Sequence, residues 1–405
     1  MKVIEGNVTA AKGFKAGGIH CGVKSPEGGK KDLAMILSQV ECTAAATYTR
    51  NKTKADPLYV SMAHLEKGKA WGIICNSGNA NACAPNGKEH AIRMCQAAAA
   101  ATGHKGEDFA VASTGVIGQE LNIQAILSGI PSLAESLSVQ GGDDAASAIM
   151  TTDLKEKAIA VEMELGGKTV RLGGIAKGSG MIHPNMGTML CFLTTDAAIS
   201  HELLQKALRE AVRVTFNRVS VDGDTSTNDM CCILANGLGE NQPILSENED
   251  YRRFMEGLAF VCRTLARAIA ADGEGASRLV TCIVQNARDE EEGETVAKAV
   301  IASSLVKAAM FGADANWGRV LCAAGYSGAD CHPENISVAF SSAAGRIPVC
   351  EKGKGLVFDE DLAKKILLEK EVTIEVDLNE GKTHVEAWGC DLSYEYVRIN
   401  GDYRS

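Results

Sequence analysis

A glycine-rich stretch runs directly into an apolar one at residues 177–192, which read KGSGMIHPNMGTMLCF. The first part is typical of a flexible loop, and the apolar run from Met189 to Leu193 predicts a buried strand. Thr188 stands where the loop becomes the strand. A fold of this chain must therefore place a hydroxyl side chain at the beginning of a buried strand.

Thr188 has two interpretations. A threonine hydroxyl is a poor nucleophile unless a base accepts its proton. If the Gly187–Thr188 peptide bond is cut, the new α-amine of Thr188 can be that base, because its reference pKa of about 7.7–8.0 suits proton transfer near neutral pH. In the alternative, which is the commoner case for a Gly-Thr pair before an apolar run, Thr188 is simply the first residue of a strand.

The composition indicates a globular protein. The chain has 405 residues, of which 45% are hydrophobic and only 5% aromatic, and it contains 42 glycines. Such a chain can bury one large core or two fused ones, closely packed and with many tight turns. The net charge of −10 argues against nucleic-acid binding, which requires a basic face. A small anionic substrate stays open, because a local pocket can differ in sign from the whole protein.

The fourteen cysteines predict buried free thiols and no metal site. Several lie in apolar stretches, as buried free thiols do; these are Cys21, Cys42, Cys75, Cys95, Cys191, Cys262, Cys282 and Cys322. The sequence has no CxxC motif, so zinc-ribbon and thioredoxin-like sites are unsupported. The N-terminus lacks a signal-peptide core, and no apolar run is long enough to span a membrane. We therefore expect a soluble, reduced, cytoplasmic protein.

Strand and helix patterns alternate along the chain, which predicts an α/β fold. Helices are expected at residues 88–101, 141–150, 249–271, 296–310 and 361–368, with another after the cap Ser200. Strands are expected at residues 34–37, 42–49, 71–75, 109–114, 189–193, 230–235, 278–285 and 396–400. Two hairpins are predicted, at residues 158–172 and 372–388. No linker or repeat marks a domain boundary.

Two familiar motifs are incomplete. Gly167-Lys168-Thr169 matches the end of a phosphate-binding P-loop, but Glu162 stands where the first glycine is required. The segment SVDGDTSTND at residues 220–229 is similar to a calcium loop, but it lacks the glutamate that an EF-hand needs at its twelfth position. We reject both interpretations.

Three loops have both a structural and a functional interpretation. The segment NSGNAN at 76–81 is either a plain turn or a set of polar donors at the end of a strand. The glycine turn after the strand at 109–114 is either an ordinary connection or an anion-holding loop of backbone N–H groups. Glu274, between two glycines just past a helix, is either solvated or functional. The acidic run 289–292 is expected to be a solvated helix start.

Together these segments resemble the ornithine acetyltransferases of arginine biosynthesis, the ArgJ-type glutamate N-acetyltransferases. The resemblance spans nearly the whole chain in order. It rests on the segments NSGNAN at 76–81, STGVIG at 113–118, TTD at 151–153, KGSGMIHPNM at 177–186 before Thr188-Met-Leu, SVDGDTSTND at 220–229, DGEG at 272–275, GADANWGR at 312–319 and the tail from Asn400 to Ser405.

The resemblance implies an N-terminal-nucleophile-like α/β fold, with mixed sheets packed with helices, that cleaves itself before Thr188. The products are an α chain of residues 1–187 and a β chain of residues 188–405, which assemble as an α2β2 heterotetramer. Thr188 then takes an acetyl group from N2-acetyl-L-ornithine and passes it to L-glutamate, with no cofactor or metal.

The resemblance also assigns site residues. Thr114 and Gly115 match the oxyanion-hole pair. The substrate-contacting positions match Thr152, Lys177, Thr188, Glu274, Asn400 and Ser405. Two residues depart from the family pattern: Gly187 stands where alanine is usual, which would hold the cleavage geometry less firmly, and Ser405 stands where threonine is frequent.

Other functions stay open. An N-terminal-nucleophile aminopeptidase or amidase would use the same residues, with water in place of glutamate. An uncleaved binding protein would need Thr188 only as a structural residue. Acetyl-CoA is a further candidate donor. No nucleotide-phosphate loop is visible, but a thioester can react at a pocket mouth without one. We favour acetylornithine as the sole donor, because it needs only the pocket already described.

Overall fold

The computed structural model describes residues 1–25, 27–183 and 189–402. Gly187, Thr188 and Ser405 lie outside the described residues. The chain divides into two compact units. The first comprises Met1–Gly178, Pro184–Asn217 and Thr225–Leu265, and the second comprises Ser179–His183, Arg218–Asp224 and Ala266–Ser405. The predicted α and β chains are a division of a different kind, and that division stays a prediction.

The first unit is built on one mixed sheet, which has nine strands among the described residues, in the order β1-β6-β7-β8-β10-β3-β4-β5, with β2 paired to β3. The pairs β8–β10 and β4–β5 are parallel and the others antiparallel. The strands are β1 (Lys2–Ile4), β2 (Phe14–Ile19), β3 (Leu33–Tyr48), β4 (Lys69–Asn79), β5 (Phe109–Val116), β6 (Lys157–Leu165), β7 (Lys168–Lys177), β8 (Leu190–Thr195) and β10 (Met230–Ala235).

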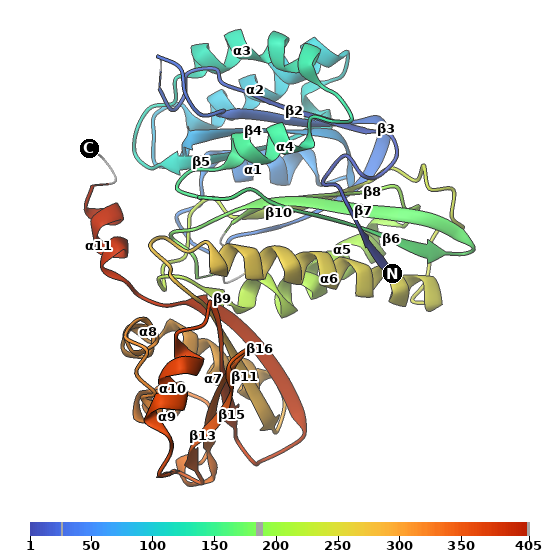
Figure 1. Ribbon diagram of the computed structural model, residues 1–405. Coiled ribbons are helices and arrows are strands. Elements are labelled where there is room, and N and C mark those ends of the chain that lie inside the picture. The colour runs from blue at the N-terminus through green and yellow to red at the C-terminus, as the bar shows by residue number, and fades with distance from the viewer. Residues whose placement is uncertain (26, 184–188, 403–405) are drawn as a thin grey trace. The chain divides into compact units, whose positions relative to one another are not determined.

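Helices pack on both faces of this sheet. They are α1 (Asp56–His64), α2 (Gly87–Thr102), α3 (Ile123–Ser136), α4 (Gly142–Ile149), α5 (His201–Val214) and α6 (Glu249–Ala271). Helix α4 lies in the core that β2 and β3 share with β8 and β10. Figure 1 shows α2 and α3 over β2–β5, and α5 with α6 along β6–β8 and β10. The predicted N-terminal-nucleophile-like α/β class, with mixed sheets packed against helices, is confirmed by this arrangement; self-cleavage is not tested by it.

Successive side chains of β3 pack into two different cores, which explains why both faces of the sheet are covered. Leu33 and Met35 pack into a core shared with α2 and α3, whereas Ala34 and Ile36 pack into a core shared with β8 and β10. Successive side chains of a strand point to opposite faces. A strand with apolar residues at every position therefore has to lie between two layers.

The second unit has a mixed sheet of seven strands in the described part of the chain, in the order β14-β13-β12-β15-β11-β16-β9. The strands are β9 (Val219–Ser220), β11 (Leu279–Ala287), β12 (Ser337–Ser342), β13 (Gly345–Glu351), β14 (Lys354–Gly355), β15 (Glu371–Asp377) and β16 (Thr383–Cys390). The helices are α7 (Glu290–Ala302), α8 (Ser304–Phe311), α9 (Trp317–Gly325), α10 (Glu360–Leu367) and α11 (Tyr394–Gly401).

The predicted hairpin at residues 372–388 is wrong. β15 and β16 do not pair with each other, because β11 lies between them, parallel to β15 and antiparallel to β16. Val280, Cys282 and Val284 of β11 are buried in the core of this unit. This apolar strand is supplied by a distant segment, which a pattern confined to residues 372–388 cannot show. The hairpin of β6 and β7 around residues 166–167 is confirmed.

One helix prediction and one strand prediction also change. The expected helix at residues 296–310 is two helices, because Ser303 has an extended backbone and its side chain caps α8 by accepting from the Val306 N–H. The expected strand at residues 396–400 is part of helix α11, which Ser393 caps. Within the expected turn at residues 312–319, Asn316 caps α9. In each case a polar side chain supplies the helix with its missing acceptor.

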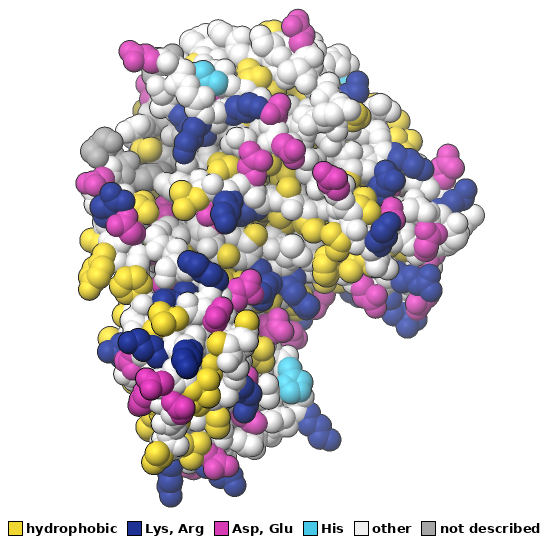
Figure 2. Space-filling model, in the orientation of Figure 1, with side chains coloured by type: hydrophobic (Ala, Val, Ile, Leu, Met, Phe, Trp, Pro, Cys, Tyr) yellow, Lys and Arg dark blue, Asp and Glu magenta, His cyan; other side chains and the backbone are white. Residues whose placement is uncertain are grey.

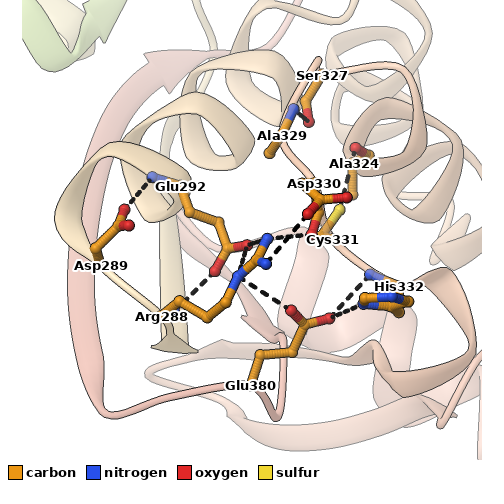
Figure 3. A network of polar contacts seen from close by, with 10 residues as sticks. All are labelled: Arg288, Asp289, Glu292, Ala324, Ser327, Ala329, Asp330, Cys331, His332 and Glu380. Carbon is orange, nitrogen blue, oxygen red and sulfur yellow. Dashed lines mark hydrogen bonds and ion pairs between the residues drawn. The ribbon is translucent and has the colours of Figure 1, made fainter.

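Burial differs from the prediction at three places. Asn76 and Asn79 continue strand β4 and are buried. Cys322 is exposed on α9, and Cys21 is only half-buried. Glu292 belongs to the acidic run that was expected to be solvated, but it is buried, because it pairs with Arg288 (Figure 3).

Candidate active site

Four strands of the first unit end or begin at the same level. In neighbouring strands, Lys177 of β7 lies opposite Leu190 of β8, and Leu190 lies opposite Met230 of β10. On its other side, Met230 lies opposite Tyr48 of β3. Met189, one residue before Leu190, accepts a hydrogen bond from the Met230 N–H over 3.0 Å. Met189 directly follows Thr188 in the sequence, so the chain enters β8 at this end of the sheet.

Lys177 reaches across this end of the sheet to Thr114. Its side chain is buried, and its Nζ donates to Thr114 Oγ1 over 3.3 Å. Lys177 ends β7, whereas Thr114 is near the end of β5. The structure therefore brings together a predicted substrate-binding residue and a predicted oxyanion-hole residue from distant parts of the chain.

Gly115 is held in a conformation that requires glycine. Its φ is +133°, and a Cβ at this position would lie 2.3 Å from the carbonyl carbon of Gly78. β4 and β5 are paired here, with Gly78 opposite Gly115. Two backbones thus approach more closely than any side chain would permit. The structure supports a special backbone at Gly115, and its role as an oxyanion donor stays a prediction.

Buried asparagines hold the ends of β4, β5 and β10 together. Asn228 Nδ2 donates to the carbonyls of Ala80 and Ser113, over 2.6 and 2.8 Å. Asn76 accepts from the Ser113 hydroxyl over 2.6 Å. These contacts give the asparagine-rich segment at residues 76–81 a structural role. Asn228 belongs to the polar segment 220–229, but its role depends on contacts that the sequence does not reveal.

Asp153 anchors the residue after Lys177. Asp153 is buried, and its Oδ1 accepts from Lys157 Nζ and from the Gly178 N–H, each over 2.7 Å, while Oδ2 accepts from the Thr151 N–H over 3.1 Å. Burial alone would raise the pKa of Asp153, but the positive charges of Lys177 and Lys157 more than offset it, so the pKa is lowered. An ionised Asp153 thus fixes the end of β7.

Thr152 lies in the turn beside Asp153 and is half-buried. Its neighbour Asp153 accepts from Gly178 and Lys157, so Thr152 belongs to the same part of the first unit as Lys177. The sequence resemblance named Thr152 as the substrate contact and gave no role to Asp153, although both stand in the TTD segment.

Lys24 is a second lysine near Lys177 that sequence reasoning missed. Its Nζ donates to the Lys31 carbonyl over 2.7 Å. Burial lowers the pKa of Lys24 to about 8; the carboxylate of Asp32 opposes this shift, and the positive charges of Lys30 and Lys177 add to it. Lys24 and Lys177 are therefore close enough for their charges to interact, with the carboxylates of Asp32 and Asp153 beside them.

Glu274 and Asn400, two of the predicted substrate-binding residues, lie together in the second unit. Asn400 Nδ2 donates to Glu274 Oε2 over 2.8 Å. Glu274 is buried, and its backbone N–H donates to the Ser179 carbonyl over 2.8 Å. A Cβ at Gly180 would lie 2.3 Å from the Glu274 carboxyl carbon, so Gly180 leaves room for that side chain. Glu274 is not the solvated turn residue that remained possible from sequence.

On the face drawn in Figure 2, acidic and basic side chains are interspersed, and neither kind forms a large patch of its own. Among residues 1–25, 27–183 and 189–402, no cluster of three or more His, Cys, Asp or Glu side chains could hold a metal ion. Within the same residues, no helix is both long enough and apolar enough to cross a membrane.

An α/β fold that gathers a buried lysine, a hydroxyl and a strained glycine at one sheet end is suited to transfer chemistry at a carbonyl group. The family profile described as the ArgJ family matches residues 15–405. The chain therefore belongs to the ArgJ family.

Individual relatives agree with this assignment. The arginine biosynthesis bifunctional protein ArgJ of Caldanaerobacter subterraneus subsp. tengcongensis is 47% identical over 406 residues, covering all of both chains. The arginine biosynthesis bifunctional protein ArgJ 1 of Clostridium acetobutylicum is 48% identical over 400 residues, or 98% of each chain. A crystal structure of arginine biosynthesis bifunctional protein ArgJ from Bacillus halodurans matches with 46% identity and a TM-score of 0.50, covering 52% of this chain and 98% of that chain.

Proposed function

We propose that this protein transfers an acetyl group from N2-acetyl-L-ornithine to L-glutamate in arginine biosynthesis. The observation that carries the proposal is the contact between Lys177 and Thr114 at the sheet end where the chain enters β8. This is the end at which the sequence places Thr188. The names of the full-length relatives, which are arginine biosynthesis proteins, support the assignment.

The proposed reaction passes through acetyl-Thr188. The Thr188 hydroxyl attacks the acetamide carbon, its proton passes to the Thr188 α-amine, and the N–H groups at Thr114 and Gly115 stabilise the oxyanion. Collapse of the intermediate releases ornithine and leaves the acetyl ester. The amine of glutamate then attacks this ester and restores the free hydroxyl. Each half-reaction exchanges one acetyl group, so the kinetics should be ping-pong.

Self-cleavage between Gly187 and Thr188 is the first step of the proposal, because only cleavage creates the α-amine. The coverage of the Bacillus halodurans crystal structure supports it. That chain is matched over 98% of its own length yet covers 52% of this one, so it is about half as long. The curated relatives match over the full length of this chain. Chains of about half length are expected if family members are cut near the middle.

The substrates are zwitterions, and the charged residues suit them. Lys177 can hold a substrate carboxylate and Glu274 a substrate amino group. Thr152, Asn400 and Ser405 are proposed to add hydrogen bonds. The cleaved chains are proposed to assemble as an α2β2 heterotetramer in the cytoplasm, and size-exclusion chromatography with light scattering would test that assembly.

We also propose acetyl-CoA as a second acetyl donor. Sequence alone favoured acetylornithine as the sole donor, but the relatives are named bifunctional, which favours a second activity. Purified enzyme given glutamate and acetyl-CoA should then release the free thiol. Absence of thiol release, with normal turnover of acetylornithine, would restrict the enzyme to recycling.

The main test is the dependence of acetylornithine turnover on glutamate. Ornithine release should need glutamate and should match acetylglutamate formation mole for mole. Release at a similar rate without glutamate would identify an amidase, which is the runner-up function. Full activity in a preparation that contains only the intact chain would overturn the cleavage step.

A further inference from the structure

Lys24 packs on the strand end that adjoins Thr114 and Gly115, the predicted oxyanion pair. Lys24 is half-buried, and a Cβ at Gly78 would lie 2.7 Å from its Cγ, so the lysine stem lies against the backbone of β4. Gly78 is opposite Gly115 of β5, at the point where the two backbones approach too closely for a side chain. Lys24 therefore lies at the sheet end that carries the predicted site.

The buried carboxylate of Asp32 holds the turn that carries Lys24. Its Oδ1 accepts from the Cys21 N–H over 2.6 Å, and its Oδ2 accepts from the N–H groups of residues 22–24 over 2.8 to 3.1 Å. The Asp32 carbonyl accepts from the Ser77 N–H of β4 over 2.9 Å. The turn is thus fixed to the end of β4, and the Asp32 carboxylate is engaged by the backbone.

Lys24 and Lys177 stand on either side of Thr114 and Gly115. Lys177 donates to the Thr114 hydroxyl over 3.3 Å, whereas Lys24 donates to the Lys31 carbonyl over 2.7 Å. Both acceptors are neutral, and in the described part of the chain neither ammonium forms an ion pair with a carboxylate. Each lysine therefore keeps N–H donors for an anionic ligand.

The acids near Lys177 do not take this place. Asp153, whose charge Lys177 helps to stabilise, directs both of its oxygens to the other donors described above. Asp229 also faces Lys177, but burial raises the pKa of Asp229 well above its usual value, which favours the neutral acid. Two like charges held close together repel each other, and an anion bound between them would remove that repulsion.

The two proposed substrates differ at the end of the side chain. Acetylornithine has one carboxylate and a side-chain ammonium, whereas glutamate has a second carboxylate in place of that ammonium. One lysine can hold the carboxylate that both substrates share, and a second cation is needed for the carboxylate that only glutamate has. The residues assigned so far supply a single lysine, Lys177. This inference therefore rests on the proposed function and concerns its acceptor.

We propose that Lys24 binds the side-chain carboxylate of glutamate and thereby selects the acetyl acceptor. Lys177 holds the carboxylate that both substrates share. The same ammonium repels the side-chain ammonium of ornithine, so Lys24 favours glutamate over the amine that has just been released. The ligand class that fits the two lysines together is an amino acid with two carboxylates.

The test compares the two half-reactions in Lys24→Met. With ping-pong kinetics, kcat/KM for each substrate reports the half-reaction of that substrate. The value for glutamate should fall about 10- to 100-fold, because a hydrogen bond between charged groups is lost. The value for acetylornithine should change by no more than about threefold, because its side chain carries no anion. Lys24→Arg should recover most of the loss for glutamate.

Lys30→Met is the matched control, because Lys30 is exposed and its charge also acts on Lys24. This variant should keep kcat/KM for glutamate within about twofold, since exposed charges are screened by salt. Equal losses in the two variants would attribute the effect to overall charge and would overturn a contact at Lys24. Glutamine, which has a neutral side chain, should be a poor acceptor for the wild type, and Lys24→Met should narrow its disadvantage.

A binding measurement on the wild type covers the case in which Lys24→Met fails to fold. Because its pKa is lowered to about 8, Lys24 should react readily with an acylating reagent near that pH. Glutarate has both carboxylates and no amine, so it should slow the modification of Lys24 and leave that of Lys30 unchanged, as followed by peptide mass spectrometry. Equal modification of Lys24 with and without glutarate would contradict the inference.

Failure of the inference and failure of the proposed function give different results. A wild type that needs glutamate, together with an unchanged kcat/KM for glutamate in Lys24→Met, would overturn the role of Lys24 alone. A wild type that releases ornithine at full rate without glutamate would overturn the proposed function, and the role of Lys24 with it.

Discussion

Two charged clusters, one at the end of β7 in the first unit and one around Arg288 in the second, differ in how completely they are paired. In the second cluster Arg288 contacts Glu292 over 2.8 Å, Asp330 over 3.2 Å and Glu380 over 3.4 Å (Figure 3). Glu380 also accepts from the backbone N–H and the ring of His332, both over 2.9 Å. Each acid in this cluster has a cation or an N–H donor.

The cluster at the end of β7 is less completely paired. Lys177 donates to a neutral hydroxyl over 3.3 Å, and Asp229 has a buried oxygen without a partner among the described residues. An unpaired buried acceptor costs about 1–3 kcal/mol of stability. Charges that neutralise one another hold a structure, whereas a charge kept without a full set of partners is available to a substrate or a proton.

The largest effect is expected from Thr188→Ala. Wild-type protein should appear as two pieces on denaturing gels, one of which begins Thr-Met-Leu-Cys by Edman sequencing. The variant should stay whole and lose at least about a thousandfold in activity, because both cleavage and transfer need the hydroxyl. Thr195→Ala, at the far end of β8, removes a hydroxyl that donates to the Arg171 carbonyl of β7, and this control should still be cut. Efficient cleavage of the Thr188 variant would assign the cut to another residue.

A second comparison sets Lys177 against Arg288. Lys177→Met should lower kcat/KM about 100-fold, because it removes the buried charge beside Thr114. Arg288→Met should leave kcat/KM within about twofold and lower the denaturation midpoint, because it leaves buried Glu292 without its cation. Steady-state kinetics and urea unfolding check both. A large loss of activity from Arg288→Met would break the distinction between the clusters.

A smaller effect is expected at Gly115. Gly115→Ala should lower kcat about tenfold or more, because the added methyl would meet the Gly78 backbone and shift this end of β5. Gly118→Ala is the control: Gly118 also has a positive φ, of +78°, but nothing lies within 4 Å of the added carbon. Equal losses of kcat in the two variants would attribute the effect to φ rather than to the close approach.

The smallest effect concerns His332. Hydrogen bonding to Glu380, and then its charge, raises the pKa of His332. The stabilising contact is therefore fully present below the unfolded pKa of about 6.5 and is lost as pH rises through the raised folded value. In the wild type the urea midpoint should fall slightly as the pH is raised through the folded pKa of His332. In His332→Gln this fall should be absent. Because the side chain is exposed, an effect comparable to that of Arg288→Met would be inconsistent with this account.

The sequence predicted long elements better than short ones. The bounds of α6 at residues 249–271 are confirmed, because a long apolar stripe on a helix is a strong local signal. Helix α11 was taken for a strand, because its eight residues include Tyr394 and Val397, which are largely exposed and give no helical stripe. Short elements depend on caps and tertiary contacts more than on their own pattern.

The site was predictable only where its residues stand in recognisable sequence segments. Thr114, Gly115, Lys177 and Glu274 stand in such segments. The structure brings Lys177 to Thr114 and Glu274 to Asn400, and the roles of these residues in the site stay predictions. Asp229 stands in the segment 220–229, which carries part of the family resemblance, but the resemblance assigns it no role. Its position opposite Met189 follows from the register of β10 against β8, which joins strands far apart in the sequence.

The most direct test of the account is the mass of the piece that begins with Thr188. Purified enzyme should be mixed with acetylornithine in the absence of glutamate, quenched and measured intact, with peptide mapping to locate any change. The account predicts one added acetyl group on Thr188 that disappears when glutamate is added. Turnover without an acetylated intermediate, or acetylation at another residue, would contradict it.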